Sequence, residues 1–176
     1  HVSNVSCYGL NDGMITVEQL NASSSIYSFY INGVLNTNPI PYDTVFDNLS
    51  AGIYNISISD NGQCQIDDSI IVSEPNFPLQ LSSSLSDSIY LCYNTPTGSA
   101  VASAIGGTPS YSYEWFDGSY TSIGTSDSIS GLSGGSYFVK VTDANGCDTA
   151  TTLQVLQMQT PLVGNNQIFG VACKGD

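Results

Sequence analysis

The chain has 176 residues and a net charge of −13, and Lys140 and Lys174 are its only Lys or Arg residues. This acidity excludes nucleic acids and anionic membranes as partners, because both bind basic surfaces. No run of residues approaches the roughly 18 apolar positions of a membrane-spanning helix, so we expect no direct membrane insertion. Only 10% of the residues are charged, and Ser, Thr, Asn and Gly supply the other polarity, which is typical of an extracellular β-protein.

Two copies of one sequence pattern follow each other along the chain. The motif that begins at Cys7 recurs at Cys92, and the motif that ends at Cys64 recurs at Cys147, so the period is close to 83 residues. Val171 begins what resembles a third copy. Self-similarity at a fixed period indicates stacked modules. We therefore predict two domains and the start of a third, truncated repeat, at residues 1–76, 77–158 and 159–176.

Short alternating runs rich in Val, Ile, Tyr and Thr predict strands in the same order in each copy. The pairs Asn61-Gly62 and Asn145-Gly146 lie between the last two strands of each copy, where two residues with positive φ form a tight hairpin. Six or seven antiparallel strands in about 80 residues are typical of an immunoglobulin-like β-sandwich. The predicted strands are 13–20, 26–31, 53–59 and 68–73, then 79–85, 99–105, 112–116, 126–130, 136–142 and 149–156.

Three aromatic positions support this all-β fold of two immunoglobulin-like sandwiches arranged end to end. Trp115 falls on the third strand of the second copy, where such a sandwich buries a large aromatic residue, and Ile31 takes that place in the first copy. Tyr54 and Tyr137 each follow a Leu-x-x-Gly turn at the start of the penultimate strand. We expect both hydroxyl groups to donate to the preceding backbone, as in a tyrosine corner.

Several longer motifs occur in this chain: Cys-x-Gly followed by Asp12-Gly13, Gly106-Gly-Thr-Pro-Ser-Tyr-Ser-Tyr-Glu-Trp115, Gly131-Leu-Ser-Gly-Gly-Ser-Tyr137, Val141-Thr-Asp-Ala-Asn-Gly-Cys147 and Ser73-Glu-Pro75. Together they resemble the SprB-type repeat of very large surface adhesins of gliding Bacteroidota, which the type IX secretion system exports. The resemblance covers nearly the whole chain. It implies a non-catalytic repeat segment of a long extracellular filament or adhesin at the cell surface, which serves as spacer and adhesive module in surface attachment or gliding motility.

An alternative function from another class is a ligand-binding accessory domain of a secreted enzyme, dependent on carbohydrate or calcium. Many tandem copies without a catalytic domain in the full-length gene favour the filament, whereas one or two copies beside a hydrolase favour the accessory domain. The expected partners are adjacent repeats of the same chain and a surface polysaccharide or protein ligand.

The sequence offers little for catalysis. The only histidine is His1, so neither a Ser-His-Asp triad nor a Cys-His pair can form. A carboxylate pair remains available in principle, but most of these aspartates occupy turn positions or strand ends. We therefore predict that the chain is not an enzyme.

Metal binding has one candidate ion. The cysteine spacing contains no Cys-x-x-Cys motif and argues against zinc. Calcium requires only clustered oxygen ligands, although no EF-hand spacing is present. We predict no cofactor, with calcium as the open alternative at five weak candidates: Asp60, Asp67, Asp68, Asp143 and Asp148.

The cysteines of an exported chain meet an oxidising environment, where disulfides form. Each copy has one cysteine before its second strand and one at the start of its last strand, and this recurrence favours Cys7–Cys64 and Cys92–Cys147. In a standard sandwich, however, these positions lie at opposite ends, which favours Cys64–Cys92 and Cys147–Cys173, or free thiols. Spacing alone leaves these connectivities open.

Five segments read Asp, then Ser or Thr, then an aliphatic residue, whereas composition predicts about 0.8 by chance. The motif resembles the O-glycosylation motif of exported Bacteroidota proteins, and the resemblance implies sugars on the hydroxyl residue. Alternating strand starts would also generate the motif without any sugar. The candidate positions are Thr44, Ser69, Ser88, Ser128 and Thr149.

Eleven tyrosines offer material for a carbohydrate-stacking surface. Tyr54, Tyr113 and Tyr137 fall on inward strand positions and are expected in the core. The tyrosines in predicted loops are the better candidates for ligand contact, although the sequence alone defines no binding site: Tyr8, Tyr42, Tyr93 and Tyr120.

Overall fold

A computed structural model describes residues 1–18, 27–35, 44–60, 64–85, 90–91 and 95–157 of the chain. Every regular element in these ranges is a β-strand. The same ranges contain no helix of the length and hydropathy that a membrane crossing requires. The chain divides into two compact units, His1–Pro78 and Leu79–Asp176, which we call unit 1 and unit 2. The predicted third repeat at 159–176 lies outside the described residues.

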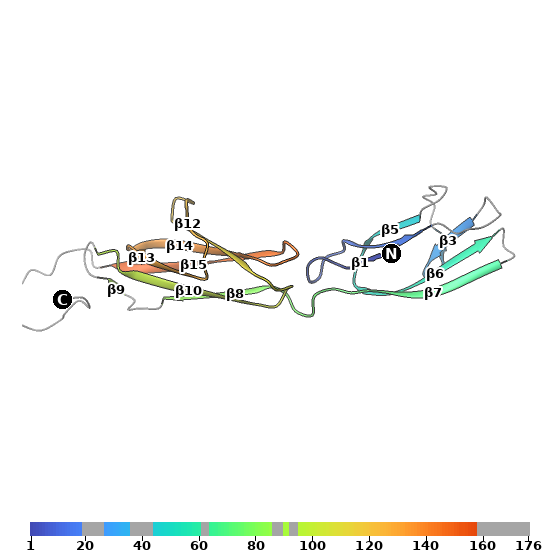
Figure 1. The fold of residues 1–176 in the computed structure, drawn as a ribbon, viewed down its shortest axis with the longest axis horizontal. Helices are drawn as coiled ribbons and strands as arrows, with labels where there is room; N and C mark the ends of the chain where they lie inside the picture. The colour runs from blue at the N-terminus through green and yellow to red at the C-terminus, as the bar shows by residue number, and fades with distance from the viewer. Residues whose placement is uncertain (19–26, 36–43, 61–63, 86–89, 92–94, 158–176) are drawn as a thin grey trace, which may run out of the picture. The chain divides into compact units, whose positions relative to one another are not determined.

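Unit 1 is a sandwich of two antiparallel sheets (Figure 1), with the strand orders β1-β2-β5 and β4-β3-β6-β7. Its core joins Ile15 and Phe46 of the first sheet to Ile56 and Val72 of the second. Alternation along the strands explains this core, because every second side chain of a strand points to the same face. The strands are β1 (Val2–Ser3), β2 (Gly13–Val17), β3 (Tyr27–Ile31), β4 (Val34–Leu35), β5 (Thr44–Leu49), β6 (Gly52–Asp60) and β7 (Cys64–Val72).

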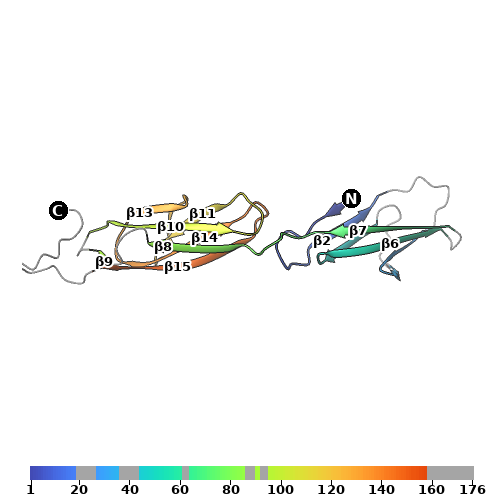
Figure 2. The ribbon, with the colours of Figure 1, turned by 90° about the horizontal axis from the view of Figure 1, so that it is seen from below.

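Unit 2 repeats this plan with sheets ordered β13-β10-β8 and β12-β11-β14-β15-β9 (Figure 2). β9, at one edge of the second of these sheets, pairs in parallel with the end of β15, where Leu91 lies opposite Gln157. The predicted immunoglobulin-like sandwich is therefore confirmed in both units. The strands are β8 (Gln80–Leu85), β9 (Tyr90–Leu91), β10 (Gly98–Ile105), β11 (Ser112–Phe116), β12 (Ser122–Gly124), β13 (Ser128–Leu132), β14 (Gly135–Thr142) and β15 (Asp148–Gln157).

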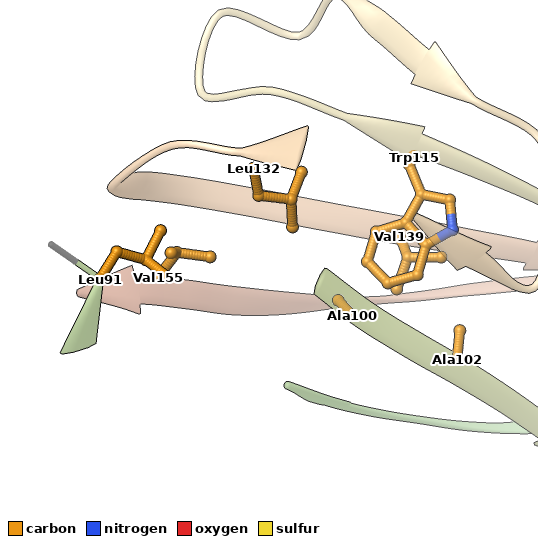
Figure 3. Close-up of a cluster of buried hydrophobic side chains, with 7 residues drawn as sticks. All are labelled: Leu91, Ala100, Ala102, Trp115, Leu132, Val139 and Val155. Atoms are coloured by element: carbon orange, nitrogen blue, oxygen red, sulfur yellow. The ribbon is translucent and has the colours of Figure 1, made fainter. Parts of the chain in front are cut away.

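The core of unit 2 is built around one large side chain. Trp115 is 0% exposed and its indole N–H donates to the Ser126 carbonyl at 2.9 Å, as a buried indole requires. Figure 3 shows the indole beside Val139, with Ala100 and Ala102 on β10. At the same repeat positions unit 1 has Ile31 in place of Trp115, and Ile15 and Val17 in place of the two alanines. Small and large residues thus exchange places while the core stays filled.

Both predicted tyrosine corners are present. The Tyr54 hydroxyl donates to the Ser50 carbonyl at 2.9 Å, and the Tyr137 hydroxyl donates to the Ser133 carbonyl at 3.1 Å. Each tyrosine ring packs against the core of its own unit. The shared four-residue spacing therefore fixes the turn before the penultimate strand in the same way in both units.

The hairpin between β14 and β15 differs from the predicted turn. Of the pair Asn145-Gly146, only the glycine has a positive φ, +86°. The turn is organised instead by Asp143, which is 6% exposed. Its carboxylate accepts backbone N–H groups of Asn145 at 2.9 Å, Cys147 at 3.0 Å and Thr108 at 2.8 Å. This buried side chain joins the hairpin to the loop that precedes β11. The equivalent Asn61-Gly62 lies outside the described residues.

Candidate functional site

The predicted Cys7–Cys64 disulfide is wrong. Cys64 is an exposed free thiol and is the first residue of β7. Cys7 lies near the other end of that strand, because the neighbouring Val5 donates its N–H to the Ser73 carbonyl, just beyond Val72. The nine residues of β7 span roughly 26 Å, whereas disulfide-linked Cα atoms lie only about 4–7 Å apart. The free thiol also excludes the alternative Cys64–Cys92 pairing.

Cys7 and Cys147 are each disulfide-bonded. Cys92 and Cys173 lie outside the described residues, so the pairing Cys92–Cys147 and its alternative Cys147–Cys173 stay predictions. Leu91, the residue before Cys92, pairs with Gln157, whereas Cys147 immediately precedes the opposite end of the ten-residue strand β15. The length of β15 therefore argues against Cys92–Cys147, as the length of β7 does against Cys7–Cys64.

Iodoacetamide added without a reducing agent is expected to modify Cys64 in the folded protein, whereas Cys7 and Cys147 are modified only after reduction. Peptide mapping by mass spectrometry checks this result. As a control, Cys64→Ser should leave stability nearly unchanged. If Cys64 were instead bonded to Cys7, loss of that disulfide would cost about 4 kcal/mol. Recovery of Cys64 in a disulfide-linked peptide would contradict the structure.

The candidate glycosylation positions lie beside open sheet edges wherever they are described. Ser69 and Ser128 are exposed, and they lie on β7 and β13, the outer strands of their sheets. Thr149 is half-buried near the start of β15, where the described partner of β15 on the far side from β14 is β9, which reaches only Leu156 and Gln157. Ser88 and the side chain of Thr44 lie outside the described residues.

The two calcium candidates of unit 1 whose side chains are described, Asp67 and Asp68, belong to no group of three ligand side chains that would hold a metal ion. Asp67 accepts a hydrogen bond from the Gln65 side-chain amide at 2.8 Å. Hydrogen bonding from the Ser57 side chain, and to a smaller extent from Gln65, holds the pKa of Asp67 below its usual value. Asp68 accepts the backbone N–H of Ser69 at 2.8 Å. Both aspartates line an open depression on β6 and β7, whereas the side chain of Asp60 lies outside the described part of the chain.

The candidates in unit 2 separate in role. Asp143 uses both carboxylate oxygens to accept backbone N–H groups, which makes it a structural residue of the hairpin. Asp148 is exposed at the start of β15. Across the described ranges, no three His, Cys, Asp or Glu side chains are grouped in a way that would hold a metal ion. Calcium therefore stays an untested alternative.

A cluster of three aromatic rings lies on the outer face of the larger sheet of unit 2. Phe116 on β11 lies opposite Phe138 on β14, and their ring centroids are 5.3 Å apart with the planes inclined by 20°. Tyr120, from the turn between β11 and β12, lies with its ring centroid 4.4 Å from that of Phe138. We call Phe116, Tyr120 and Phe138 the aromatic platform. Trp115 and Val139 form the adjacent pair and are buried, so alternation directs the two phenylalanines away from the core.

The turn that carries Tyr120 is tightly organised. The Asp117 carboxylate accepts the N–H groups of Ser119 at 2.8 Å and Thr121 at 3.0 Å, and the Asp117 carbonyl accepts the N–H of Tyr120 at 3.0 Å. Tyr120 has φ of +63°, a region that bulky residues rarely adopt. The loop position of Tyr120 was predicted, but its phenylalanine partners were not. Strand alternation could have predicted that both phenylalanines face outward, because each is next to an inward residue, Trp115 or Val139.

Comparisons with known proteins connect this framework to one repeat family. The model of the SprB repeat matches residues 1–36 and 90–119, one segment in each unit. The predicted resemblance to this repeat is therefore confirmed over these two segments. No curated protein sequence matches the chain.

Solved structures show the fold alone. An intimin fragment of 282 residues, in complex with the intimin-binding domain of the translocated intimin receptor, is 10% identical with a TM-score of 0.50; the match covers 89% of this chain and 64% of that chain. The amphioxus IgVJ-C2 molecule is 12% identical with a TM-score of 0.38 and coverage of 84% and 97%. Fibronectin(III)-like modules of Clostridium thermocellum CbhA are 15% identical with a TM-score of 0.34 and coverage of 82% and 86%.

Proposed function

We propose that this chain is a non-catalytic repeat segment of a long extracellular surface filament or adhesin, and that its units act as spacer and adhesive modules in surface attachment or gliding motility. The observation that supports this proposal is the repetition of one self-contained unit. Each unit has its own core, the same two-sheet plan and the same tyrosine corner. Units of this kind can extend a chain by addition, because each one buries its own hydrophobic core.

The differences between the units support a division of labour. The framework residues recur, whereas the outer sheet face does not: the aromatic pair Phe116 and Phe138 of unit 2 is replaced by Asn32 and Asn55 in unit 1. A fold that is repeated for length needs only the framework. An exposed cluster that occurs in one copy and not in the other is free to serve contact with a surface.

The proposal is tested in the source organism by replacing the segment that encodes unit 2 with a second copy of unit 1. This change keeps the number of modules while removing the aromatic platform. We expect export of the full protein to continue and attachment of cells to surfaces to fall. Deletion of both units should reduce attachment at least as strongly. Unchanged attachment and motility in both strains would contradict the adhesive role.

We also propose that the Asp-Ser/Thr-aliphatic segments carry O-linked sugars. Hydrated sugars at Ser69, Ser128 and Thr149 would cover open edges that otherwise invite pairing with another strand, in a chain with few charges to prevent it. The Ser69 hydroxyl donates to the Asn55 side chain at 2.8 Å, and a sugar at this position would replace that bond.

Mass spectrometry of chymotryptic peptides from the native protein is expected to find hexose-sized increments on these segments, lost from the Ser128 peptide in Ser128→Ala. Ser130 lies on the same strand and follows Ile129 rather than an aspartate, so Ser130→Ala serves as the matched control and should keep the sugar. Unmodified peptides throughout would end the glycosylation proposal without affecting the module assignment.

A further inference from the structure

We infer that the aromatic platform of unit 2 is a binding site for a neutral polysaccharide, whose sugar rings stack on Tyr120, Phe116 and Phe138. This inference deepens the adhesive role proposed above and rests on it. It assigns that role to one face of one unit and to one class of ligand.

The fold does not require aromatic residues at these positions. In unit 1 the pair of buried Ile56 and half-buried Ile31 corresponds to Val139 and Trp115 of unit 2. The next pair outward is Asn32 and Asn55, which are joined by Asn32 N–H to Asn55 carbonyl at 2.8 Å and Asn55 N–H to Asn32 side-chain oxygen at 3.0 Å. The same sandwich therefore forms with polar side chains there. The aromatic rings of unit 2 need a reason other than folding.

The backbone conformation of Tyr120 supports the same inference. A tyrosine with φ of +63° costs on the order of 1–3 kcal/mol relative to a relaxed backbone, and glycine or asparagine would avoid much of this cost. Tyr120 as a residue is nevertheless 78% exposed, so burial offsets little of the strain. The Asp117 hydrogen bonds hold the turn so that the ring lies against Phe138. An exposed ring kept in a strained and rigid turn is preorganised for contact.

The size of the platform selects its occupant. Three rings, two of them half-buried, expose on the order of 300 Å² of apolar surface. A stable protein interface needs about 800 Å² on each partner. One or two sugar rings match the smaller area. Their axial C–H groups carry partial positive charge and are attracted to the negative faces of aromatic rings.

The groups around the platform match the hydroxyl groups of a sugar and not a charge. On one side Glu114 lies directly opposite Lys140, so opposite charges neighbour each other. On the other side the Ser136 hydroxyl donates to the Gln154 side chain at 2.8 Å, and both residues are exposed. These groups donate and accept hydrogen bonds, which is how a sugar edge is recognised. The net charge of −13 repels anionic polysaccharides at long range and leaves neutral ones unaffected.

The test measures binding of the purified chain to cellohexaose, xylohexaose, mannohexaose, laminarihexaose and maltohexaose by isothermal titration calorimetry, with oligogalacturonate as the anionic comparison. We expect at least one neutral hexasaccharide to bind. Tyr120→Asn and the double variant Phe116→Asn/Phe138→Asn, which copies unit 1, should each weaken that binding at least about tenfold. Tyr8 is also an exposed loop tyrosine, in unit 1, and Tyr8→Asn should leave binding unchanged.

Structural damage is separated from loss of contact by melting curves. Asparagine tolerates positive φ, so Tyr120→Asn should melt within about 4 °C of the original protein while binding is lost. Binding of oligogalacturonate alone, absence of binding to every neutral hexasaccharide, or binding that survives both platform variants would each overturn the inference. None of these outcomes bears on whether cells use the segment for attachment, which the strain with two copies of unit 1 and the full deletion measure separately.

Discussion

Trp115→Ala is expected to destabilise unit 2 by about 3–5 kcal/mol while leaving unit 1 folded. The indole is 0% exposed and packs among Val139, Ala100 and Ala102, so its removal leaves a cavity that two neighbouring alanines cannot fill. Loss of the indole N–H also deprives the Ser126 carbonyl of that hydrogen-bond donor. Hydrogen–deuterium exchange checks the result, because it should accelerate in β10, β11 and β14 and stay unchanged in β2 and β6.

The control for this prediction comes from unit 1. The triple variant Ala100→Ile/Ala102→Val/Trp115→Ile installs the side chains that unit 1 uses at the same positions. It conserves core volume approximately and should cost less than Trp115→Ala, whereas Ala100→Ile alone overpacks the core and should cost about 1–3 kcal/mol. If the triple variant lost as much stability as Trp115→Ala, the large and small side chains of the two cores would not be interchangeable in the way the structure indicates.

Asp143→Ala is expected to destabilise unit 2 by about 2–4 kcal/mol, because three backbone N–H groups lose a charged acceptor inside the fold. Asp143→Asn should cost less, since one side-chain oxygen remains for two of the donors while the amide nitrogen opposes the third. Gly107→Ala tests the same contact from the other side, because an added Cβ would lie 2.5 Å from the Asp143 carboxylate and φ there is +57°.

Urea denaturation monitored by circular dichroism provides the measurement for these variants. Asp148 is the matched control, because it is an exposed aspartate on the neighbouring strand, and Asp148→Ala should change stability by no more than about 0.5 kcal/mol. A calcium-dependent stability that is lost in Asp143→Ala would contradict the structural role assigned to Asp143.

Periodicity was sufficient to predict the fold class, the two tyrosine corners and the burial of Trp115. It missed β5 in unit 1, where the segment Asp47-Asn48 resembles a turn. Asn48 has φ of +56°, and the pairing of β2 with β5 shifts register at this place. A bulge hides alternation from the sequence, although the equivalence of Thr44 and Ser128 in the two copies marks both strand starts.

The candidate site depended on information that spacing does not contain. The distance between Cys7 and Cys64 along the chain reveals nothing about which end of β7 each approaches. Phe116 and Phe138 are brought together by the register of β11 with β14, and Tyr120 is placed by the side chain of Asp117. Alternation can predict that the two phenylalanines face outward, but cross-strand register and side-chain hydrogen bonds determine that the three rings meet.

The most direct test of the proposed surface role is antibody labelling of intact cells of the source organism. Antibodies raised against the purified chain should label unpermeabilised cells, and the signal should disappear after brief external proteolysis and in a strain that lacks the segment. Labelling that requires permeabilisation, or that resists external protease, would place the segment inside the cell envelope and contradict the assignment to an extracellular filament.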